Sequence, residues 1–268
     1  MDLTTTPAFR QPRPTRSPAA SAAPADDLGV VRDSGREAQP TTRLMLLGGF
    51  QLVHDGAVLE LPVHAQRLLA YLGLAEHSSR VLTAGTLWPD VREQRALGNL
   101  RSTVWRLQRI CPSVVVASRN VLTLSPAVTV DVRECRAAVA QPGKQPTDHG
   151  AAELSQGSFC HELLPGWYED WILVERDRLQ HLRLQALEEA ADLMLRRGRY
   201  GEAMDAALAA VRSDPLRESA RRLILRIHLA EGNQVEAVRH FHSYRALLAT
   251  ELGIEPSPRT WALVAPSS

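Results

Sequence analysis

A repeat in the C-terminal half of this chain restricts its possible folds more than any other feature of the sequence. The segments LRRGRYGEAMDAA (195–207) and LAEGNQVEAVRHF (229–241) align with an offset of 34 residues. The matching residues are Leu195 and Leu229, Gly198 and Gly232, Glu202 and Glu236, and Ala203 and Ala237. A period of this length is typical of antiparallel helix pairs that stack side by side. The repeat therefore predicts an all-α domain, with Asp214-Pro215 breaking the chain after the first pair.

The N-terminal half has a different pattern, in which short apolar runs alternate with turn signals. The stretch RLMLLGGFQLVHDGAVLELP contains Asp55-Gly56 between two such runs, and this pair is typical of two-residue hairpin turns. We expect an antiparallel sheet here, with Gly48 and Gly49 inside one of its strands. Further along, SVVVASRNVLTLSPAVTVDV predicts a second hairpin with its turn at residues 118–120.

Three helices are predicted between these strand regions. Leucines at helical spacing predict the first in VHAQRLLAYLGLAEH, and TAGTLWP predicts a short second helix with Thr83 as its N-cap. The third is RALGNLRSTVWRLQR (95–109), which Pro112 ends. Strands, helix, short helix, long helix and hairpin, in this order, predict a winged helix-turn-helix.

The long helix has two distinct faces. At 100° per residue, one sector about 80° wide holds the apolar residues Leu97, Leu100, Val104 and Leu107. The opposite sector holds Arg95, Asn99, Ser102, Arg106 and Arg109, and Arg101 and Trp105 flank it. Residues 91–110 carry five arginines against one acid, Glu93, which makes them the densest positive stretch of the chain. Such a cluster suits a polyanionic partner.

These side chains are suited to reading DNA in the major groove, where Arg pairs with guanine and Asn with adenine. The arginines at the margins, with Arg67 on the first helix, are suited to phosphates. Arg119 at the hairpin tip is placed for the neighbouring minor groove. For Trp105 we favour packing against the hairpin over stacking on bases. The alternative for the whole face is a solvated arginine surface, which the winged-helix order disfavours.

Composition agrees with a nucleic-acid-binding N-terminal region. The net charge of the chain is only +1, but residues 41–140 hold eleven arginines against seven acids, whereas residues 158–268 hold fourteen against sixteen. The three cysteines, Cys111, Cys135 and Cys160, show neither a disulfide framework nor a zinc-ligand spacing, which fits a reducing cytoplasm. No secretory signal or membrane-spanning run is present, so we expect no membrane association.

Signals of catalysis are poor. The glycines of LLGGFQ lack the helix and lysine of a phosphate-binding loop. His240 and His242 are two residues apart on a predicted helix, which directs them to different faces instead of to one metal. We therefore predict that the chain is not an enzyme and uses neither a cofactor nor a metal.

The expected organisation has four parts: a disordered tail at 1–41, a winged-helix domain at 42–131, a helical domain at 132–264 and a short tail at 265–268. The helical domain begins with a short helix at 132–140 and a polar connector at 141–157. The cluster of Trp167, Tyr168 and Trp171 is expected to seal the core of the helical domain. The alternative is that part of it lies at an interface with the winged-helix domain or a partner.

Five segments in order, LLGGFQL, AQRLLAYL, LWPDV, RALGNLRSTVWRLQR and LPGWYEDWILVERDRL, resemble the antibiotic-regulatory-protein (SARP) group of transcriptional regulators. The resemblance spans about residues 42–264. It implies a mainly α fold with a small β component: an OmpR-like winged helix followed by a tetratricopeptide-like bacterial transcriptional activator domain (BTAD).

The resemblance also implies a function. Members are DNA-binding activators that bind in tandem to direct repeats in double-stranded promoter DNA, contact RNA polymerase and often switch on secondary-metabolite clusters. By residue, the recognition helix would use Arg95, Asn99, Arg101, Ser102 and Arg106. The polymerase contact would be the loop formed by Trp88, Pro89, Asp90, Val91, Arg92 and Glu93. We expect no ATPase and no phosphoacceptor domain in this chain.

Two other functions remain open at the level of sequence. The tetratricopeptide-like half could act as an adaptor that binds protein partners, or the protein could repress by occluding a promoter. Repression shares all the DNA chemistry of activation, so the sequence does not separate them.

Overall fold

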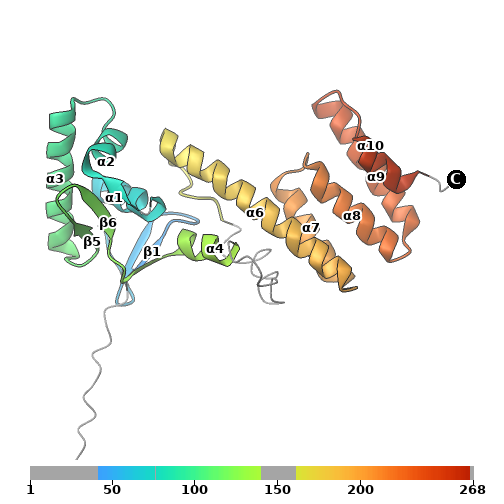
Figure 1. The fold of residues 1–268 in the computed structure, drawn as a ribbon, viewed down its shortest axis with the longest axis horizontal. Helices are drawn as coiled ribbons and strands as arrows, with labels where there is room; N and C mark the ends of the chain where they lie inside the picture. The colour runs from blue at the N-terminus through green and yellow to red at the C-terminus, as the bar shows by residue number, and fades with distance from the viewer. Residues whose placement is uncertain (1–41, 76, 140–160, 266–268) are drawn as a thin grey trace, which may run out of the picture. The chain divides into compact units, whose positions relative to one another are not determined.

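The computed structural model describes residues 42–75, 77–139 and 161–265 (Figure 1). The first sheet has the order β3-β2-β1-β7. Its strands are β1 (Thr42–Met45), β2 (Gln51–His54), β3 (Ala57–Val58) and β7 (Val128–Val130). β1 pairs antiparallel with β2 and parallel with β7, so the end of the winged-helix segment returns to its first strand.

The turns of this sheet partly match the expectation. Asp55 and Gly56 have φ of 49° and 80° and form the predicted hairpin turn between β2 and β3. Gly48 and Gly49 have φ of 81° and 143° and lie between β1 and β2. The expectation that they lie inside a strand was therefore wrong, because positive φ is incompatible with a continuous strand and is a conformation that glycine adopts without steric cost.

Three helices and a small sheet complete the winged helix-turn-helix. The helices are α1 (Val63–Leu74), α2 (Arg80–Leu87) and α3 (Glu93–Ile110). The sheet has the order β4-β6-β5, with β4 at Ser78–Ser79, β5 at Val115–Ala117 and β6 at Val121–Leu124. The second hairpin, β5–β6, turns at residues 118–120 as predicted.

The start of α2 differs from the expectation. Ser79, not Thr83, is its N-cap: the Ser79 hydroxyl accepts a hydrogen bond from the Leu82 amide at 3.1 Å. Thr83 lies a turn further on, where its hydroxyl donates to the Ser79 carbonyl at 2.8 Å. The earlier hydroxyl caps the helix because Ser79 is the last residue of β4 and α2 begins at the next residue, which the sequence pattern did not reveal.

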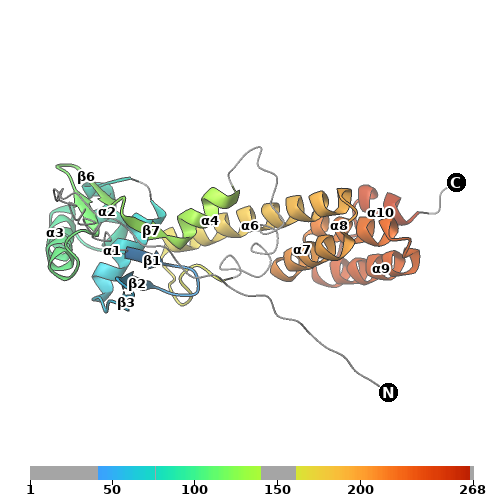
Figure 2. The ribbon, with the colours of Figure 1, turned by 90° about the horizontal axis from the view of Figure 1, so that it is seen from below.

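Apart from residues 161–169 and the turns between helices, the rest of the described chain is helical (Figure 2). The helices are α4 (Asp131–Val139), α6 (Asp170–Arg196), α7 (Tyr200–Ser213), α8 (Glu218–Ala230), α9 (Gln234–Glu251) and α10 (Pro258–Val264). The ends of α6 and α8 lie 34 residues apart, as do the starts of α7 and α9. Gly198 and Gly232, with φ of 71° and 80°, make the equivalent turns. The predicted helix pairs, and with them the mainly α fold, are confirmed.

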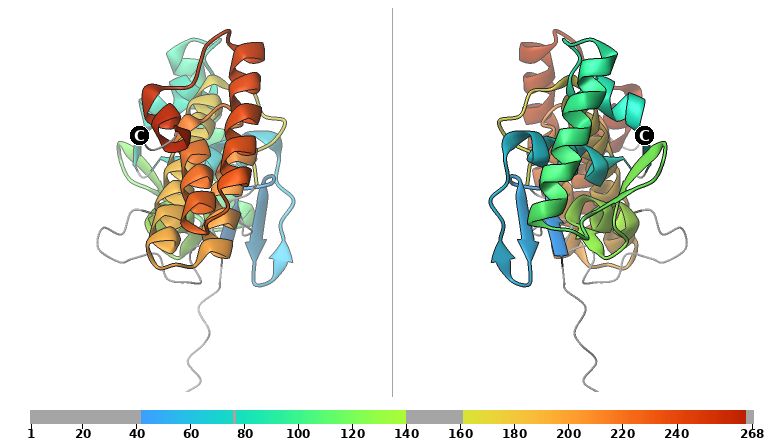
Figure 3. Two further views of the ribbon diagram at one scale, coloured as in Figure 1. Left: turned by 90° about the vertical axis from the view of Figure 1, so that its right-hand side faces the viewer. Right: turned by 90° about the vertical axis from the view of Figure 1, so that its left-hand side faces the viewer.

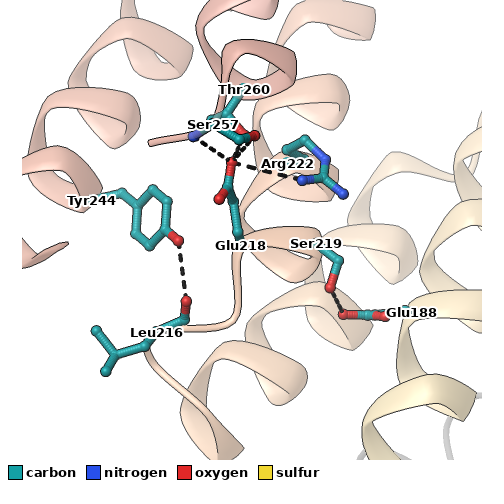
Figure 4. A network of polar contacts seen from close by, with 8 residues as sticks. All are labelled: Glu188, Leu216, Glu218, Ser219, Arg222, Tyr244, Ser257 and Thr260. Carbon is teal, nitrogen blue, oxygen red and sulfur yellow. Dashed lines mark hydrogen bonds and ion pairs between the residues drawn. The ribbon is translucent and has the colours of Figure 1, made fainter. Parts of the chain in front are cut away.

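Glu218, at the start of α8, attaches α10 to the helix pairs. Its carboxylate accepts hydrogen bonds from the Ser257 amide at 3.0 Å and from the hydroxyls of Ser257 and Thr260 (Figure 4). Nearby, the Tyr244 hydroxyl of α9 donates to the Leu216 carbonyl at 3.0 Å. None of the helices in the described ranges has the combined length and apolarity that crossing a membrane demands.

One hydrophobic core runs from the sheets into the first part of α6. It includes Leu44, Leu72 and Leu107 of the winged helix together with Leu164 and Ile172, so it continues across the expected boundary at residues 131 and 132. A backbone hydrogen bond of 2.9 Å from the Leu164 amide to the Leu46 carbonyl joins the two parts.

The aromatic cluster takes part in this core. Trp167 stacks on Phe50 with ring centroids 6.2 Å apart, and Trp171 meets Tyr71 edge to face at 5.4 Å, whereas Tyr168 is 76% exposed. The expectation that the cluster seals the helical domain was wrong. The alternative is correct for the two tryptophans, because the apolar surface available to the start of α6 is that of the winged helix.

Candidate nucleic-acid interface

The helix α3 is held by its apolar face and exposes the opposite one. Its buried residues are Ala96, Leu100, Thr103, Val104 and Leu107, and Leu97 is partly buried against the same core. The right-hand view of Figure 3 looks onto α3, and no other described element covers its outer face. Both faces of this helix are therefore close to those predicted from the sequence.

The exposed face carries positive charge that no acid in the described ranges pairs with. Arg95, Arg101, Ser102 and Arg106 are exposed, and Asn99 is partly buried. None of the three arginines forms an ion pair with a residue in the described part of the chain. Guanidinium groups without carboxylate partners are free to bind phosphates or base edges.

Trp105 differs from the expectation. Its side chain is 58% exposed, and the guanidinium carbon of Arg109, one turn further on, lies 4.9 Å from the ring centroid. Packing against the hairpin was therefore the wrong interpretation. The spacing of four residues brings the two side chains together on the helix surface and favours this cation–π contact.

The wing places Arg119 at an exposed tip. The Arg80 amide donates to the Asn120 carbonyl at 2.9 Å, and its Nε donates to the Ser118 carbonyl at 3.2 Å. Within the turn, the Ser118 amide donates to the Val121 carbonyl at 3.0 Å. Arg80 thus fastens the wing to α2. This role could not be predicted from the sequence, because it depends on the pairing of β4 with β6, which joins residues distant in sequence.

The guanidinium group of Arg67 already has an acidic partner in this structure. Its Nε lies 2.9 Å from a carboxylate oxygen of Glu169, and both side chains are largely covered. A phosphate contact by Arg67 would therefore compete with an ion pair to the residue that precedes α6.

The loop between α2 and α3 contains the residues that the resemblance associates with RNA polymerase. Trp88 and Val91 pack partly against the core, and the Trp88 ring lies 5.8 Å from that of His64. The remaining residues, Pro89, Asp90, Arg92 and Glu93, are exposed. The loop is thus anchored by two apolar side chains and presents its polar ones to solvent.

The fold joins a winged helix-turn-helix, whose helix α3 exposes arginines without acidic partners in the described ranges, to stacked helix pairs. This combination is that of a bacterial transcription regulator. The family model for the bacterial transcriptional activator domain matches residues 130–265. The regulatory protein AfsR of Streptomyces coelicolor is 30% identical over 83% of this chain, and that of Streptomyces griseus is 31% identical over 81%. The chain belongs to the family of the bacterial transcriptional activator domain and is a SARP-type transcriptional regulator.

The relatives are much longer. The matched region covers 24% and 23% of the two AfsR proteins. Among solved structures, Mycobacterium tuberculosis EmbR in complex with a low-affinity phosphopeptide has the same fold, with a TM-score of 0.68 and 20% identity. That match covers 84% of this chain and 64% of EmbR.

Proposed function

We propose that the chain is a sequence-specific activator of transcription that binds double-stranded promoter DNA through α3 and acts in the cytoplasm, where bacterial promoters lie. The observation that carries the proposal is the exposed face of α3, on which Arg95, Arg101 and Arg106 have no ion-pair partner among the described residues. A major groove is wide enough to admit an α-helix, and its base edges offer the acceptors that guanidinium groups require.

The side chains divide by position. Asn99, Ser102 and Arg106 lie in the middle of the face and are proposed to contact base edges. Arg95 and Arg109 lie toward its two ends and are proposed to contact phosphates, which fix the docking register without reading sequence. Arg119 on the wing is proposed to reach the adjacent minor groove.

The contact with RNA polymerase is proposed for residues 88–93, because four exposed side chains on an anchored loop form a small, defined protein-binding surface. Self-association on direct repeats and control of a secondary-metabolite cluster are proposed from the family. Repression by promoter occlusion would use the same DNA contacts and is separated only by transcription measurements.

An adaptor function through the helix pairs is less well supported. The cavity of about 560 Å³ between α6 and α8 is lined mainly by charged residues. Many of these are already paired with each other: Asp192 contacts Arg196 and Arg226. A peptide would have to displace these pairs, whereas Arg95, Arg101 and Arg106 of α3 have no ion-pair partner in the part of the chain that the structure describes.

The proposal is tested by genome-wide capture of DNA fragments with the purified protein at near-physiological salt. A shared direct-repeat motif upstream of promoters, with affinity that falls steeply as salt rises, supports it. Weak enrichment without a common motif, together with recovery of one protein partner in the absence of DNA, would instead favour the adaptor.

A further inference from the structure

A second cavity, of about 650 Å³, lies where the winged-helix segment meets α6 and α7. Leu47 lines it from the sheet side and forms a β-bridge with Leu163, which also lines it. None of its lining residues belongs to α3 or to the wing. The volume falls in the range of small-molecule pockets, about 300–1,000 Å³.

One part of the cavity wall is apolar. Leu163 and Leu179 are 2% and 8% exposed, whereas Leu173 is 42% exposed. Cys135 of α4 contributes a further soft, weakly polar surface. An apolar group bound here would lose contact with water without displacing a charged side chain from this wall.

The charged side chains on the rest of the wall differ in whether they have a partner in the described ranges. Arg176 pairs with Glu162 at 3.0 Å and donates to three backbone carbonyls. The other acid of the lining, Asp177, lies 3.5 Å from the ring of His181. Both carboxylates among the described lining residues therefore already face a partner.

Two guanidinium groups remain. Arg183 and Arg212 line the cavity, and neither forms a hydrogen bond or ion pair with any residue in the described ranges. The Nε of Arg183 is buried and still lacks an acceptor among the described residues. Buried donors in folded proteins are nearly always satisfied, because an unpaired one loses its hydration without compensation.

The contact between α6 and α7 brings both arginines to the cavity. The Gln180 side chain of α6 donates to the carbonyl of Ser213, the last residue of α7, at 3.0 Å. Arg183 lies three residues after Gln180, and Arg212 directly precedes Ser213. Figure 1 shows α6 and α7 side by side, and this hydrogen bond joins them next to the cavity.

We propose that this cavity is a binding site for a small organic anion: a carboxylate attached to an aliphatic body. The carboxylate binds Arg183 and Arg212, and the aliphatic part lies against Leu163, Leu173 and Leu179. Arginine binds carboxylates through paired, charge-assisted hydrogen bonds, which makes it the residue suited to such a group. The site lies apart from the proposed DNA-binding residues, so binding there is independent of the proposed DNA function.

The test uses the full chain and dansylaminoundecanoate, a fluorescent carboxylate with an aliphatic body, below its aggregation concentration. Saturable binding to one site is expected, with displacement by laurate but not by dodecylammonium, which has the same chain length and the opposite charge. Arg183→Gln is expected to weaken binding by about tenfold or more, because it removes a charged donor. Arg178→Gln is the matched control, since Arg178 lies on α6 but does not line the cavity.

A second variant tests the site in case Arg183→Gln loses binding only because it fails to fold. Leu173→Asp places a carboxylate on the partly exposed edge of the apolar wall and is expected to abolish probe binding while the thermal midpoint stays near that of wild type. No saturable binding, equal affinities of wild type and Arg183→Gln, or displacement by dodecylammonium as effective as by laurate would each overturn the proposal.

Discussion

The ring of Trp171 meets the ring of Tyr71 edge to face, with centroids 5.4 Å apart and planes at 84°. Trp171 lies in the first turn of α6, and Tyr71 lies in α1. The Tyr71 hydroxyl is within hydrogen-bond distance, 3.2 Å, of the Ser78 hydroxyl in β4. A side chain of the first long helix of the activator domain thus completes the core of the winged helix.

Trp171→Ala is expected to lower the free energy of unfolding by about 2–4 kcal/mol, because it removes a large aromatic side chain from a packed site. Urea unfolding followed by far-UV circular dichroism measures the change. Tyr168→Ala is the matched control, since Tyr168 lies three residues earlier and is 76% exposed, and it should cost less than about 0.5 kcal/mol. Equal effects of the two substitutions would contradict the role of Trp171 in the core.

The parts of the fold that could be predicted from the sequence are those with a pattern inside one segment of the chain. The 34-residue repeat predicted the helix pairs because the two turning glycines and their neighbours recur in sequence. The partner of Trp171 could not be predicted, because amphipathic spacing shows that a face is buried but not what covers it. The parallel pairing of β7 with β1 joins residues that are far apart in sequence and has no local signal.

The same distinction holds for the candidate site. The faces of α3 follow from the helical period, so Arg95 and Arg106 were placed correctly on its exposed side. The ion pair of Arg67 with Glu169, and the attachment of the wing by Arg80, depend on contacts between distant segments. No pattern within either segment indicates them.

On a cognate DNA site, Arg106→Ala and Asn99→Ala are each expected to weaken binding by about 1–3 kcal/mol, because each removes a proposed base contact. In competition experiments with DNA sites that carry single base-pair changes, each protein variant should lose discrimination between bases at one position of the site. Arg239→Ala, which removes an exposed arginine of α9, is the control and should leave affinity unchanged. Wild-type affinity in both α3 variants would remove this face from the proposed interface.

The wing should depend on Arg80. Arg80→Ala removes the hydrogen bond from Nε to the Ser118 carbonyl and leaves the backbone bond to Asn120 in place. We expect faster hydrogen exchange at the Ser118 and Val121 amides, both of which are bonded within the turn. DNA affinity should fall by no more than it does in Arg119→Ala, because Arg80 acts by positioning Arg119. Unchanged exchange in the turn would show that Arg80 does not hold the wing.

Stability should fall in mild acid because of His240. Burial lowers the pKa of His240 to about 4, and the charge of Arg221 and the neighbouring His228 act in the same direction. The folded protein keeps this imidazole neutral while the unfolded chain protonates it below about pH 6.5. Protonation therefore favours the unfolded state, so His240 destabilises the fold progressively as pH falls from about 6.5 toward 4.

This effect can be separated from that of Glu218. Burial alone would raise the pKa of Glu218, but hydrogen bonds from Ser257 and Thr260 and the charge of Arg222 outweigh it and lower the pKa. The stabilising effect of Glu218 is therefore full above its unfolded pKa, near 4.5, and is lost only as pH falls below that value.

Unfolding free energies measured from pH 7 to pH 5 should thus fall less steeply in His240→Gln than in wild type. Ser243→Gln, an exposed change on the same helix that involves no titrating group, should keep the wild-type slope. Identical slopes in all three proteins would contradict the assignment to His240.

Replacing the glycines of the repeat with alanine is expected to lower stability at some positions and raise it at another. Gly198 and Gly232 have φ of 71° and 80°, and a Cβ added at either would meet nothing within 4 Å. Alanine at these positions is expected to cost about 1–2 kcal/mol from backbone conformation alone. Gly201 also has open space around it but lies in the first turn of α7, where alanine is expected to stabilise the helix by about 0.5–1 kcal/mol. Thermal unfolding of the three variants should therefore place two midpoints below wild type and one above it; three shifts in the same direction would mean that the turn conformation does not set the stability of the helix pairs.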